Sequence, residues 1–144
     1  MEGLSTYFDF AENDFLYLSA SMEHKMIYNG MTALAQNICE KYLKHIIDEY
    51  YEPKKEEEFM VKQDILRTHS LKKLIGFLDS RMGIELSDEK YDGIIEADGY
   101  YFSARYPGES SFMVNERDVN RAYNAVKVCR DFVLAIIRKM KDGD

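Results

Sequence analysis

Apolar side chains recur at steps of three and four residues along most of this chain, which is the period of an amphipathic α-helix. One repeat predicts a long helix from about Met31 to Tyr51, with a stripe formed by Met31, Leu34, Ala35, Ile38, Tyr42, Ile46 and Tyr50. Another predicts the last helix, which begins after a cap-like Asn115 and carries Val119, Ala122, Val126, Cys129, Val133, Ile136 and Met140. No segment alternates apolar and polar residues over the length of a strand, so the pattern predicts an all-α protein.

Three further segments are expected to be helical for the same reason. The first runs from Glu12 to Lys25, after a loosely held lead-in formed by residues 1–10, and the second runs from Ile65 to Met82. The third follows the N-cap Ser87 and carries Tyr91, Ile94, Ile95, Tyr101 and Phe102. The polar stretch from Lys54 to Lys62 is expected to be a loop or an exposed half-helix. Together these segments predict an up-and-down bundle of about five helices.

The chain has the size and composition of one globular domain. It contains 144 residues, of which 46% are hydrophobic and 31% are charged, and these values are typical of folded domains rather than disordered chains. The sequence contains no linker and no shift in composition. We therefore expect residues 1–144 to form a single domain, with a core over about residues 12–141.

The net charge limits the kinds of ligand that the protein is expected to bind, and the cysteines indicate the compartment in which it is expected to lie. A formal net charge of −7 does not suit binding to bulk nucleic acid, which needs a basic surface, so any phosphate must be held by a few residues. No apolar run reaches the ~20 residues that span a bilayer, and the N-terminus lacks the pattern of a signal peptide. Cys39 and Cys129 lie in helical patterns, which suggests reduced, buried thiols. We expect a cytoplasmic protein that has no membrane segment.

Common signatures of enzymes and cofactor sites are missing from the sequence. It has no GxxxxGKS/T, GxGxxG, HExxH or GxSxG motif, and its three histidines are far apart, so we expect neither a cofactor nor a metal. What remains is a set of polar residues beside apolar helix faces. Gln36, Glu40 and Lys44 recur every four residues and form one column on the long helix. Two further elements are the segments His69-Ser70-Leu71 and Arg105-Tyr106-Pro107.

These elements resemble the HEPN domain family. HEPN domains are helical bundles of this length that carry an Ala-Gln, Glu-Lys and Leu-Lys pattern on the second helix. They also have a His-x-Leu start to the third helix and an Arg-Tyr-Pro turn before the last. The corresponding residues here are Ala35-Gln36, Glu40-Lys41, Leu43-Lys44, His69-Ser70-Leu71 and Arg105-Tyr106-Pro107. The resemblance covers nearly the whole chain, from about Glu12 to Lys141.

The resemblance implies several functions. Some HEPN proteins are ribonucleases, often toxins or defence components, while others accompany small nucleotidyltransferases, bind nucleotides or serve as protein partners, and homodimers are common. The ribonucleases carry an arginine that is followed, after four to six residues, by a histidine. None of His24, His45 and His69 has an arginine at that distance upstream. Lys62 is the nearest substitute, and it lacks the planar fork that grips a phosphate at two points.

Arg105 is the first candidate for a ligand site. Its guanidinium can hold a phosphate in bidentate geometry, with Lys44 assisting and Tyr106 shaping the pocket. The alternative is a structural role in which Arg105 pairs with a carboxylate such as Glu40 and fixes the docking of the last helix. Lys44 has a structural alternative of its own, an intrahelical pair with Glu40. His69 can act as a general acid or base, or it can cap or orient the third helix, which is the role we expect.

The sequence therefore predicts a non-catalytic HEPN-like module that binds a nucleotide or a partner protein and forms a homodimer. The resemblance links it to a nucleotidyltransferase or to a prokaryotic-type toxin–antitoxin system. One alternative is a divergent HEPN ribonuclease or toxin, in which His69 acts with Arg105 brought close in space. A second alternative is a scaffold or antitoxin-like partner that holds no ligand.

Overall fold

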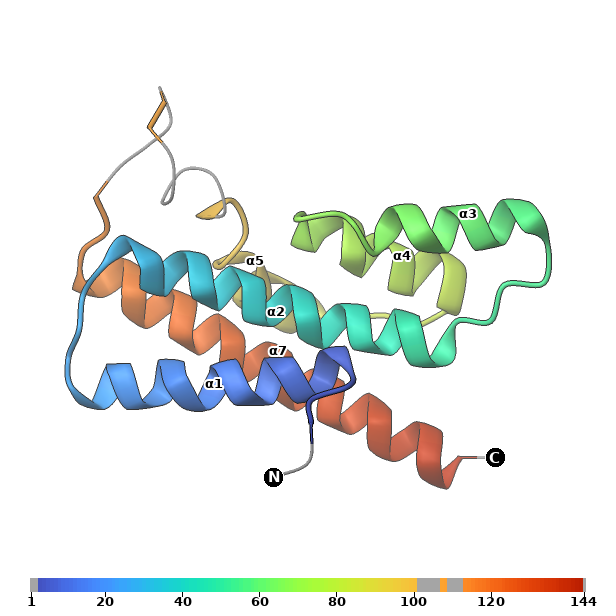
Figure 1. Ribbon diagram of the computed structural model, residues 1–144, viewed down its shortest axis with the longest axis horizontal. Coiled ribbons are helices and arrows are strands. Elements are labelled where there is room, and N and C mark those ends of the chain that lie inside the picture. The colour runs from blue at the N-terminus through green and yellow to red at the C-terminus, as the bar shows by residue number, and fades with distance from the viewer. Residues whose placement is uncertain (1–2, 101–106, 109–112, 144) are drawn as a thin grey trace.

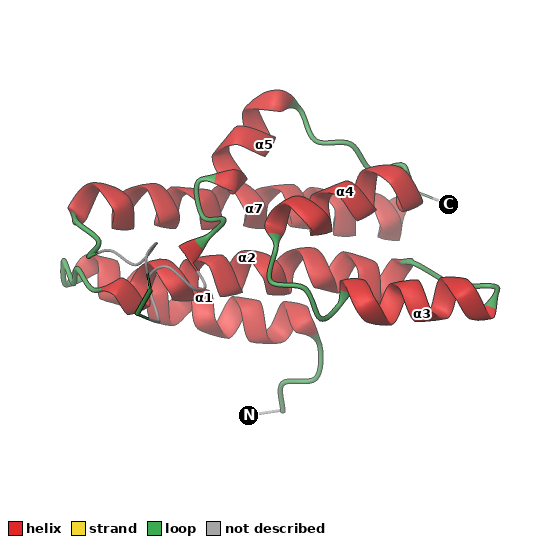
Figure 2. Cartoon of the chain, turned by 90° about the horizontal axis from the view of Figure 1, so that it is seen from above, coloured by secondary structure: helices red, strands yellow, loops and turns green. Residues whose placement is uncertain are grey.

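The computed structural model describes residues 3–100, 107–108 and 113–143. Within these residues the chain forms six α-helices and no strand, as Figures 1 and 2 show. The helices are α1 (Tyr7–Glu23), α2 (Asn29–Tyr50), α3 (Glu56–Ile65), α4 (Leu71–Met82), α5 (Asp88–Ile95) and α7 (Glu116–Asp142). The prediction of an all-helical fold is therefore confirmed for this part of the chain, and the predicted number of about five helices is too low.

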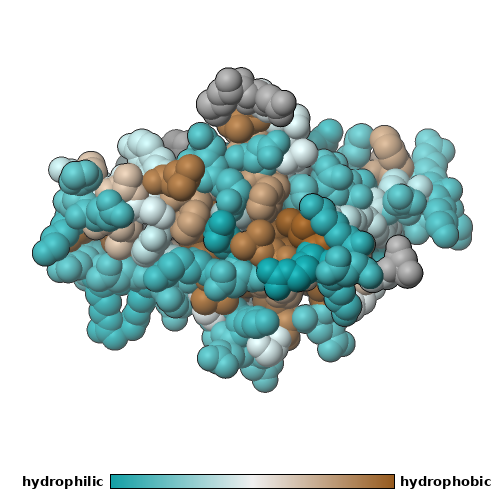
Figure 3. Space-filling model, turned by 90° about the horizontal axis from the view of Figure 1, so that it is seen from below, coloured by the Kyte–Doolittle hydropathy of each residue, from teal (hydrophilic) through white to brown (hydrophobic). Residues whose placement is uncertain are grey.

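Three long helices form the centre of the bundle. α2 packs against both α1 and α7, and the three helices run side by side in both views (Figures 1 and 2). The shorter α3 and α4 contact each other, and α4 also packs on α2. α5 packs on α7. This arrangement leaves one flank of α1 without a covering helix among the described residues and sets the short α5 against α7. Figure 3 shows the side of the molecule on which α1 lies, and apolar patches interrupt its hydrophilic surface.

α2 is the central element of the core because it is covered from several sides. Its apolar residues Ile38, Tyr42 and Ile46 are 0% exposed. They belong to one cluster with residues from four other helices, including Leu18, Leu74, Ile94, Val126 and Val133. The covering also buries polar side chains of α2, namely Thr32, Gln36, Glu40, Lys44 and His45. Buried polar groups favour partners within the protein, and the contacts of Gln36, Glu40 and Lys44 define the first candidate site below.

A hydrogen-bonded carboxylate joins the three long helices. Tyr42 of α2 donates its hydroxyl to Glu12 Oε1 of α1 at 2.6 Å. Arg130 of α7 donates to the same carboxylate twice, from Nε at 2.7 Å and from Nη2 at 3.0 Å. The hydrogen bond from Arg130 keeps the pKa of Glu12 below its ordinary value, although burial acts in the opposite direction. The charged carboxylate therefore links α1 to the rest of the bundle at neutral pH.

The start of α1 differs from the prediction. The helix begins at Tyr7 rather than near Glu12, so the expected loose lead-in is wrong for residues 7–10. The reason is a capping box, in which Thr6 Oγ1 accepts from the Asp9 amide at 3.1 Å and Asp9 Oδ2 accepts from the Thr6 amide at 3.1 Å. These two bonds satisfy amides that a helix start would otherwise leave unpaired.

The region between α2 and α4 also differs from the prediction. The polar stretch near Lys54 leads into a full helix, α3, because Glu58 Oε1 accepts from the amides of Lys54 and Lys55 before its first turn. The predicted helix from Ile65 to Met82 is interrupted: α3 ends at Ile65, and α4 begins at Leu71. Ser70 caps α4 through the Lys73 amide.

The last helix agrees with its prediction. Asn115 caps α7, since its side chain accepts from the Asp118 amide at 2.9 Å and Asp118 accepts from the Asn115 amide at 3.0 Å. Tyr101 and Phe102, which were assigned to the preceding helix, lie outside the described residues. Among the residues that the structure describes, none of the helices has both the length and the apolar character needed to cross a membrane.

Candidate functional site

The predicted column Gln36, Glu40 and Lys44 lies on a buried face of α2 and meets His69 in the α3–α4 connection. Lys44 Nζ lies 3.8 Å from Glu40 Oε2, and His69 Nδ1 lies 3.3 Å from the same oxygen. Gln36 Nε2 donates to the His69 carbonyl at 2.6 Å and to Glu40 Oε1 at 3.4 Å. The structure therefore brings together three of the predicted site residues, Glu40, Lys44 and His69. We call these residues and Gln36 the Glu40 cluster.

Burial dominates the electrostatics of the Glu40 cluster. The side chains of Glu40 and Lys44 are 1% and 9% exposed. Burial raises the pKa of Glu40 above its ordinary value, and the nearby Lys44 and His69 only partly offset that effect. Burial also lowers the pKa of Lys44, against the attraction of Glu40. Both shifts disfavour the charged forms, so removal from water outweighs the attraction within the pair.

The geometry of the Glu40 cluster suits a structural role, and the side chain of His69 is the part of the cluster that solvent reaches most easily. The cluster anchors the segment before α4 to α2, because His69 contributes both its ring and its carbonyl oxygen. The His69 side chain is 40% exposed, so a solute can reach the ring, whereas Lys44 is almost enclosed. Arg105 and Tyr106, the other two predicted site residues, lie outside the described residues.

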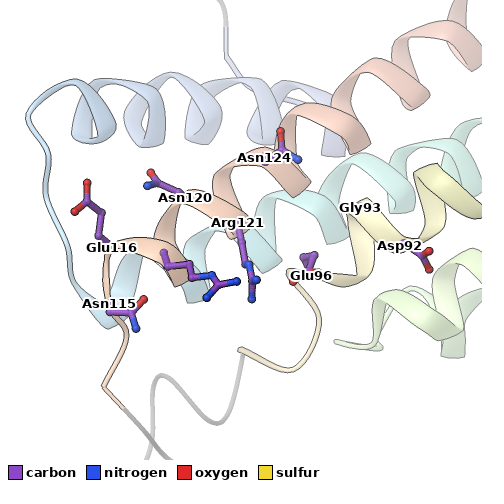
Figure 4. A pocket seen from close by; sticks show the side chains of 9 residues that line it. Asp92, Gly93, Glu96, Asn115, Glu116, Asn120, Arg121 and Asn124 are labelled. Atoms are coloured by element: carbon purple, nitrogen blue, oxygen red, sulfur yellow. The ribbon is translucent and has the colours of Figure 1, made fainter.

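A second candidate site is a groove of about 870 Å³ between α5 and α7, shown in Figure 4. Its α7 wall carries two arginines, two asparagines and one glutamate, with the cap residue Asn115 beside them, and its α5 wall carries two further carboxylates. The lining residues are Asp92, Gly93, Glu96, Asn115, Glu116, Arg117, Asn120, Arg121 and Asn124. Arg121 projects from α7 toward the end of α5, where Glu96 lies. We call this feature the α5–α7 groove.

The arginines of the α5–α7 groove are available to a ligand. Arg117 and Arg121 are both exposed, and no carboxylate of the described residues forms an ion pair with either of them. Tyr100 lies within electrostatic reach of the groove. Burial raises its pKa, Asp118 and Glu96 raise it further, and Arg121 lowers it. The groove therefore presents both signs of charge beside neutral amide groups.

The α5–α7 groove was not predicted from the sequence, because the prediction for the last helix rested on its cap and its apolar stripe alone. The signal was present on the opposite face, where Arg117, Asn120, Arg121 and Asn124 follow one another at steps of one to three residues. Residues at spacings of three and four share a helical face, but a sequence does not show that α5 forms the opposing wall.

Two residues that line the α5–α7 groove flank, along the chain, the segment that carries Arg105. Glu96 lies just before residues 101–112 in the chain, and Asn115 lies just after them, and both residues line the groove. The part of the chain that the structure describes contains no group of three His, Cys, Asp or Glu side chains that could hold a metal ion. The described lining of the groove supplies guanidinium, amide and carboxylate groups.

Comparison with known proteins identifies the family. No curated protein and no solved structure matches this chain. The model of the HEPN family, described as the HEPN domain, matches residues 5–137. That range includes all of α1 to α5 and most of α7, and it contains both candidate sites. The chain belongs to the HEPN domain family.

Proposed function

We propose that this HEPN protein is a non-catalytic module that binds a mononucleotide in the α5–α7 groove. The observation that carries the proposal is the pair of exposed arginines, Arg117 and Arg121, beside three asparagines in a groove of about 870 Å³. Small-molecule sites commonly have volumes of about 300–1,000 Å³. The chain's net charge of −7 favours a small phosphate ligand over a long nucleic acid.

The lining of the groove complements each part of a nucleotide. Arginine guanidinium groups bind phosphate through two parallel hydrogen bonds, which assigns the phosphate to Arg117 and Arg121. A carboxylate accepts hydrogen bonds from ribose hydroxyls in other nucleotide sites, and Glu96 and Asp92 supply carboxylates on the facing wall. Asparagine amides pair with the edge of adenine, a role that suits Asn120 or Asn124.

Arg105 and Tyr106 extend this proposal. The sequence segment that bears them joins the two walls of the groove, so we propose that Arg105 adds a third cation and that Tyr106 covers the base. Lys44 and His69 are proposed only as indirect contributors, because both contact Glu40. An association with a nucleotidyltransferase or a toxin–antitoxin system stays a proposal that rests on family membership.

Thermal unfolding tests nucleotide binding. At 100 times its dissociation constant, a ligand stabilises the native state by about 2.7 kcal/mol, which corresponds to a rise in midpoint of roughly 5–10 °C for a domain of this size. We expect at least one nucleotide from a panel of adenosine and guanosine mono-, di- and triphosphates to produce such a rise. Adenosine and inorganic phosphate, which each supply only part of the ligand, are expected to have little effect.

Variants locate the binding site. Arg121→Ala is expected to lose the nucleotide-dependent rise while keeping its own midpoint within about 1 °C of the unmodified protein, since exposed substitutions change stability little. Arg138→Ala is the matched control, because Arg138 is an exposed arginine of the same helix, outside the groove. A parallel Arg105→Ala variant tests the proposed third cation. Equal rises in all four proteins, or a flat panel, would contradict nucleotide binding in this groove.

A ribonuclease is the second candidate because of one observation. His69 places Nδ1 3.3 Å from the buried carboxylate of Glu40 while its ring is 40% exposed, an arrangement in which a carboxylate orients an accessible imidazole. If His69 is a general acid or base, purified protein will degrade RNA and His69→Ala will abolish that activity. Intact RNA at high protein concentration would exclude this candidate and favour the binding module.

A further inference from the structure

The two walls of the α5–α7 groove are held in place unequally. α7 has 27 residues and packs along the central helix α2. α5 has eight residues, of which Ile94 alone is buried. It packs mainly on α7, where a Cβ added at Gly93 would lie 3.5 Å from Val128. A short helix with so little buried apolar surface has low local stability, so the α5 wall depends on further contacts for its position.

The residues after α5, which we call the 96–100 segment, supply further contacts. Ala97 is 0% exposed and belongs to the core. Gly99 has a φ of +90°, which favours glycine, and an added Cβ would meet nothing within 4 Å, so the turn rather than crowding explains this glycine. Tyr100 then packs against the core and lies within electrostatic reach of Arg121. The segment therefore turns sharply beside the groove.

Asp98 fixes the 96–100 segment to a different helix, α4. Its Oδ1 accepts from the Leu71 amide at 3.1 Å, and its Oδ2 accepts from the Lys72 amide at 3.4 Å. These are the first two amides of α4, and such amides have no partner within their own helix. The positive end of the helix dipole also favours a carboxylate at this position. Asp98 thus ties the end of the α5 wall to α4.

The start of α4 is a firm anchor for Asp98. Leu71 is 0% exposed and belongs to the core. The chain just before it is held by α2, since Gln36 Nε2 donates to the His69 carbonyl at 2.6 Å. The anchor therefore belongs to the centre of the bundle, and through Asp98 it restrains Glu96, which lines the groove two residues earlier in the chain.

We infer that Asp98 is a positioning residue of the nucleotide site, which holds the wall that carries Glu96 close to the arginines of α7. The inference rests on the proposed nucleotide site. Asp98 is not among the residues that line the groove, so it acts through its neighbours in the 96–100 segment. Arg121 projects toward Glu96 at this end of α5 (Figure 4). Without the tie, the wall shifts and a ligand loses hydrogen-bond geometry on that side.

Calorimetric titration with adenosine monophosphate and guanosine monophosphate tests the role of Asp98. Asp98→Ala removes both bonds to α4 and is expected to bind about tenfold more weakly than the unmodified protein, within the roughly 5–150-fold range of coupling between sites. Asp98→Asn keeps one acceptor oxygen and is expected to fall between the two. Asp79→Ala is the matched control and is expected to bind normally, because Asp79 is an exposed carboxylate of α4 outside the groove.

The outcomes distinguish a wrong role for Asp98 from a wrong nucleotide site. Equal affinities of Asp98→Ala and the unmodified protein would overturn the role of Asp98 and leave the nucleotide site standing. An equal loss in Asp79→Ala would also overturn that role. Absence of binding in all four proteins would refute the nucleotide site and this inference with it. If Asp98→Ala does not fold, Asp98→Asn and the following measurement on the unmodified protein decide.

Amide hydrogen exchange provides a test that needs no variant. Coupling is reciprocal, so a nucleotide that binds better when the wall is held also strengthens the bonds to Asp98. Saturating adenosine or guanosine monophosphate is expected to slow exchange of the Leu71 and Lys72 amides, which lie outside the groove lining. The Lys73 amide is the internal control, because it donates to Ser70 Oγ instead, and it is expected to change less. Unchanged rates for Leu71 and Lys72, or equal slowing of all three amides, would contradict the inference.

Discussion

Replacing Lys44 with methionine is expected to lower the free energy of unfolding by about 3 kcal/mol at pH 8, because removing one partner of a buried ion pair leaves an uncompensated charge. The remaining charge is Glu40, whose side chain is 1% exposed. Methionine fills a similar volume, so the variant isolates the loss of the ammonium group. The estimate is at the low end of the usual range, since Gln36 and His69 still contact the carboxylate.

The free energy of unfolding that Lys44→Met loses is expected to be smaller at low pH than at high pH. Burial already raises the pKa of Glu40 in the folded state, and removing Lys44 raises it further. A carboxyl group whose folded pKa exceeds its unfolded value contributes stability that is present below the unfolded pKa and is lost as pH rises through the folded pKa. Urea unfolding should therefore show a smaller difference between Lys44→Met and the unmodified protein at pH 5 than at pH 8.

A double variant provides the control. Glu40→Gln with Lys44→Met removes both charges and keeps their approximate volumes, and replacing a buried pair by neutral groups is often close to neutral in stability. We expect the double variant to recover most of the stability that Lys44→Met loses at pH 8. If the double variant is as unstable as Lys44→Met, the loss comes from packing of the lysine stem rather than from the charge of Glu40.

Replacing Tyr42 with alanine is expected to have the largest effect of any single change, about 4 kcal/mol, because removing a buried aromatic ring leaves a cavity. Tyr42 is 0% exposed, and the Phe8 ring packs edge-on against it at 5.9 Å between centroids. Its hydroxyl also holds Glu12 at 2.6 Å. Denaturant unfolding followed by circular dichroism measures the change directly.

Tyr42→Phe separates the hydroxyl from the ring. It keeps the ring and removes only the hydrogen bond to Glu12, so the expected loss is about 1–1.5 kcal/mol. The two bonds from Arg130 still satisfy the carboxylate. Similar losses for the alanine and phenylalanine variants would show that the hydroxyl, rather than core packing, carries the contribution of this residue.

Periodicity in the sequence was sufficient to predict the long helices but not the short ones. α2 and α7 were located closely because their apolar stripes extend over several turns, and the Asn115 cap marked the start of α7. α3 was missed as a full helix because none of its residues is buried, so it has no strong stripe. The break at residues 66–70 depends on a distant residue. Asp98 accepts from the amides of Leu71 and Lys72, which begin α4.

The candidate sites could be predicted in part. The spacing of Gln36, Glu40 and Lys44 predicted one column, and the ion pair of Lys44 with Glu40 was the structural alternative named for Lys44. The contact of Glu40 with His69 joins positions 29 residues apart, and helical spacing says nothing about such a contact. The α5–α7 groove was missed for the same reason, since its walls belong to different helices. The role of Arg105 stays a prediction.

Nuclear magnetic resonance of the labelled protein, titrated with adenosine monophosphate and guanosine monophosphate, tests nucleotide binding most directly because each backbone amide reports separately. We expect one of these nucleotides to shift the amide signals of Glu96, Asn120 and Arg121 in a saturable way, while the signals of Leu16 and Tyr17 on α1 stay unchanged. An unchanged spectrum at millimolar nucleotide, or shifts that are confined to the α1–α2 side, would contradict the assignment of the α5–α7 groove as the nucleotide site.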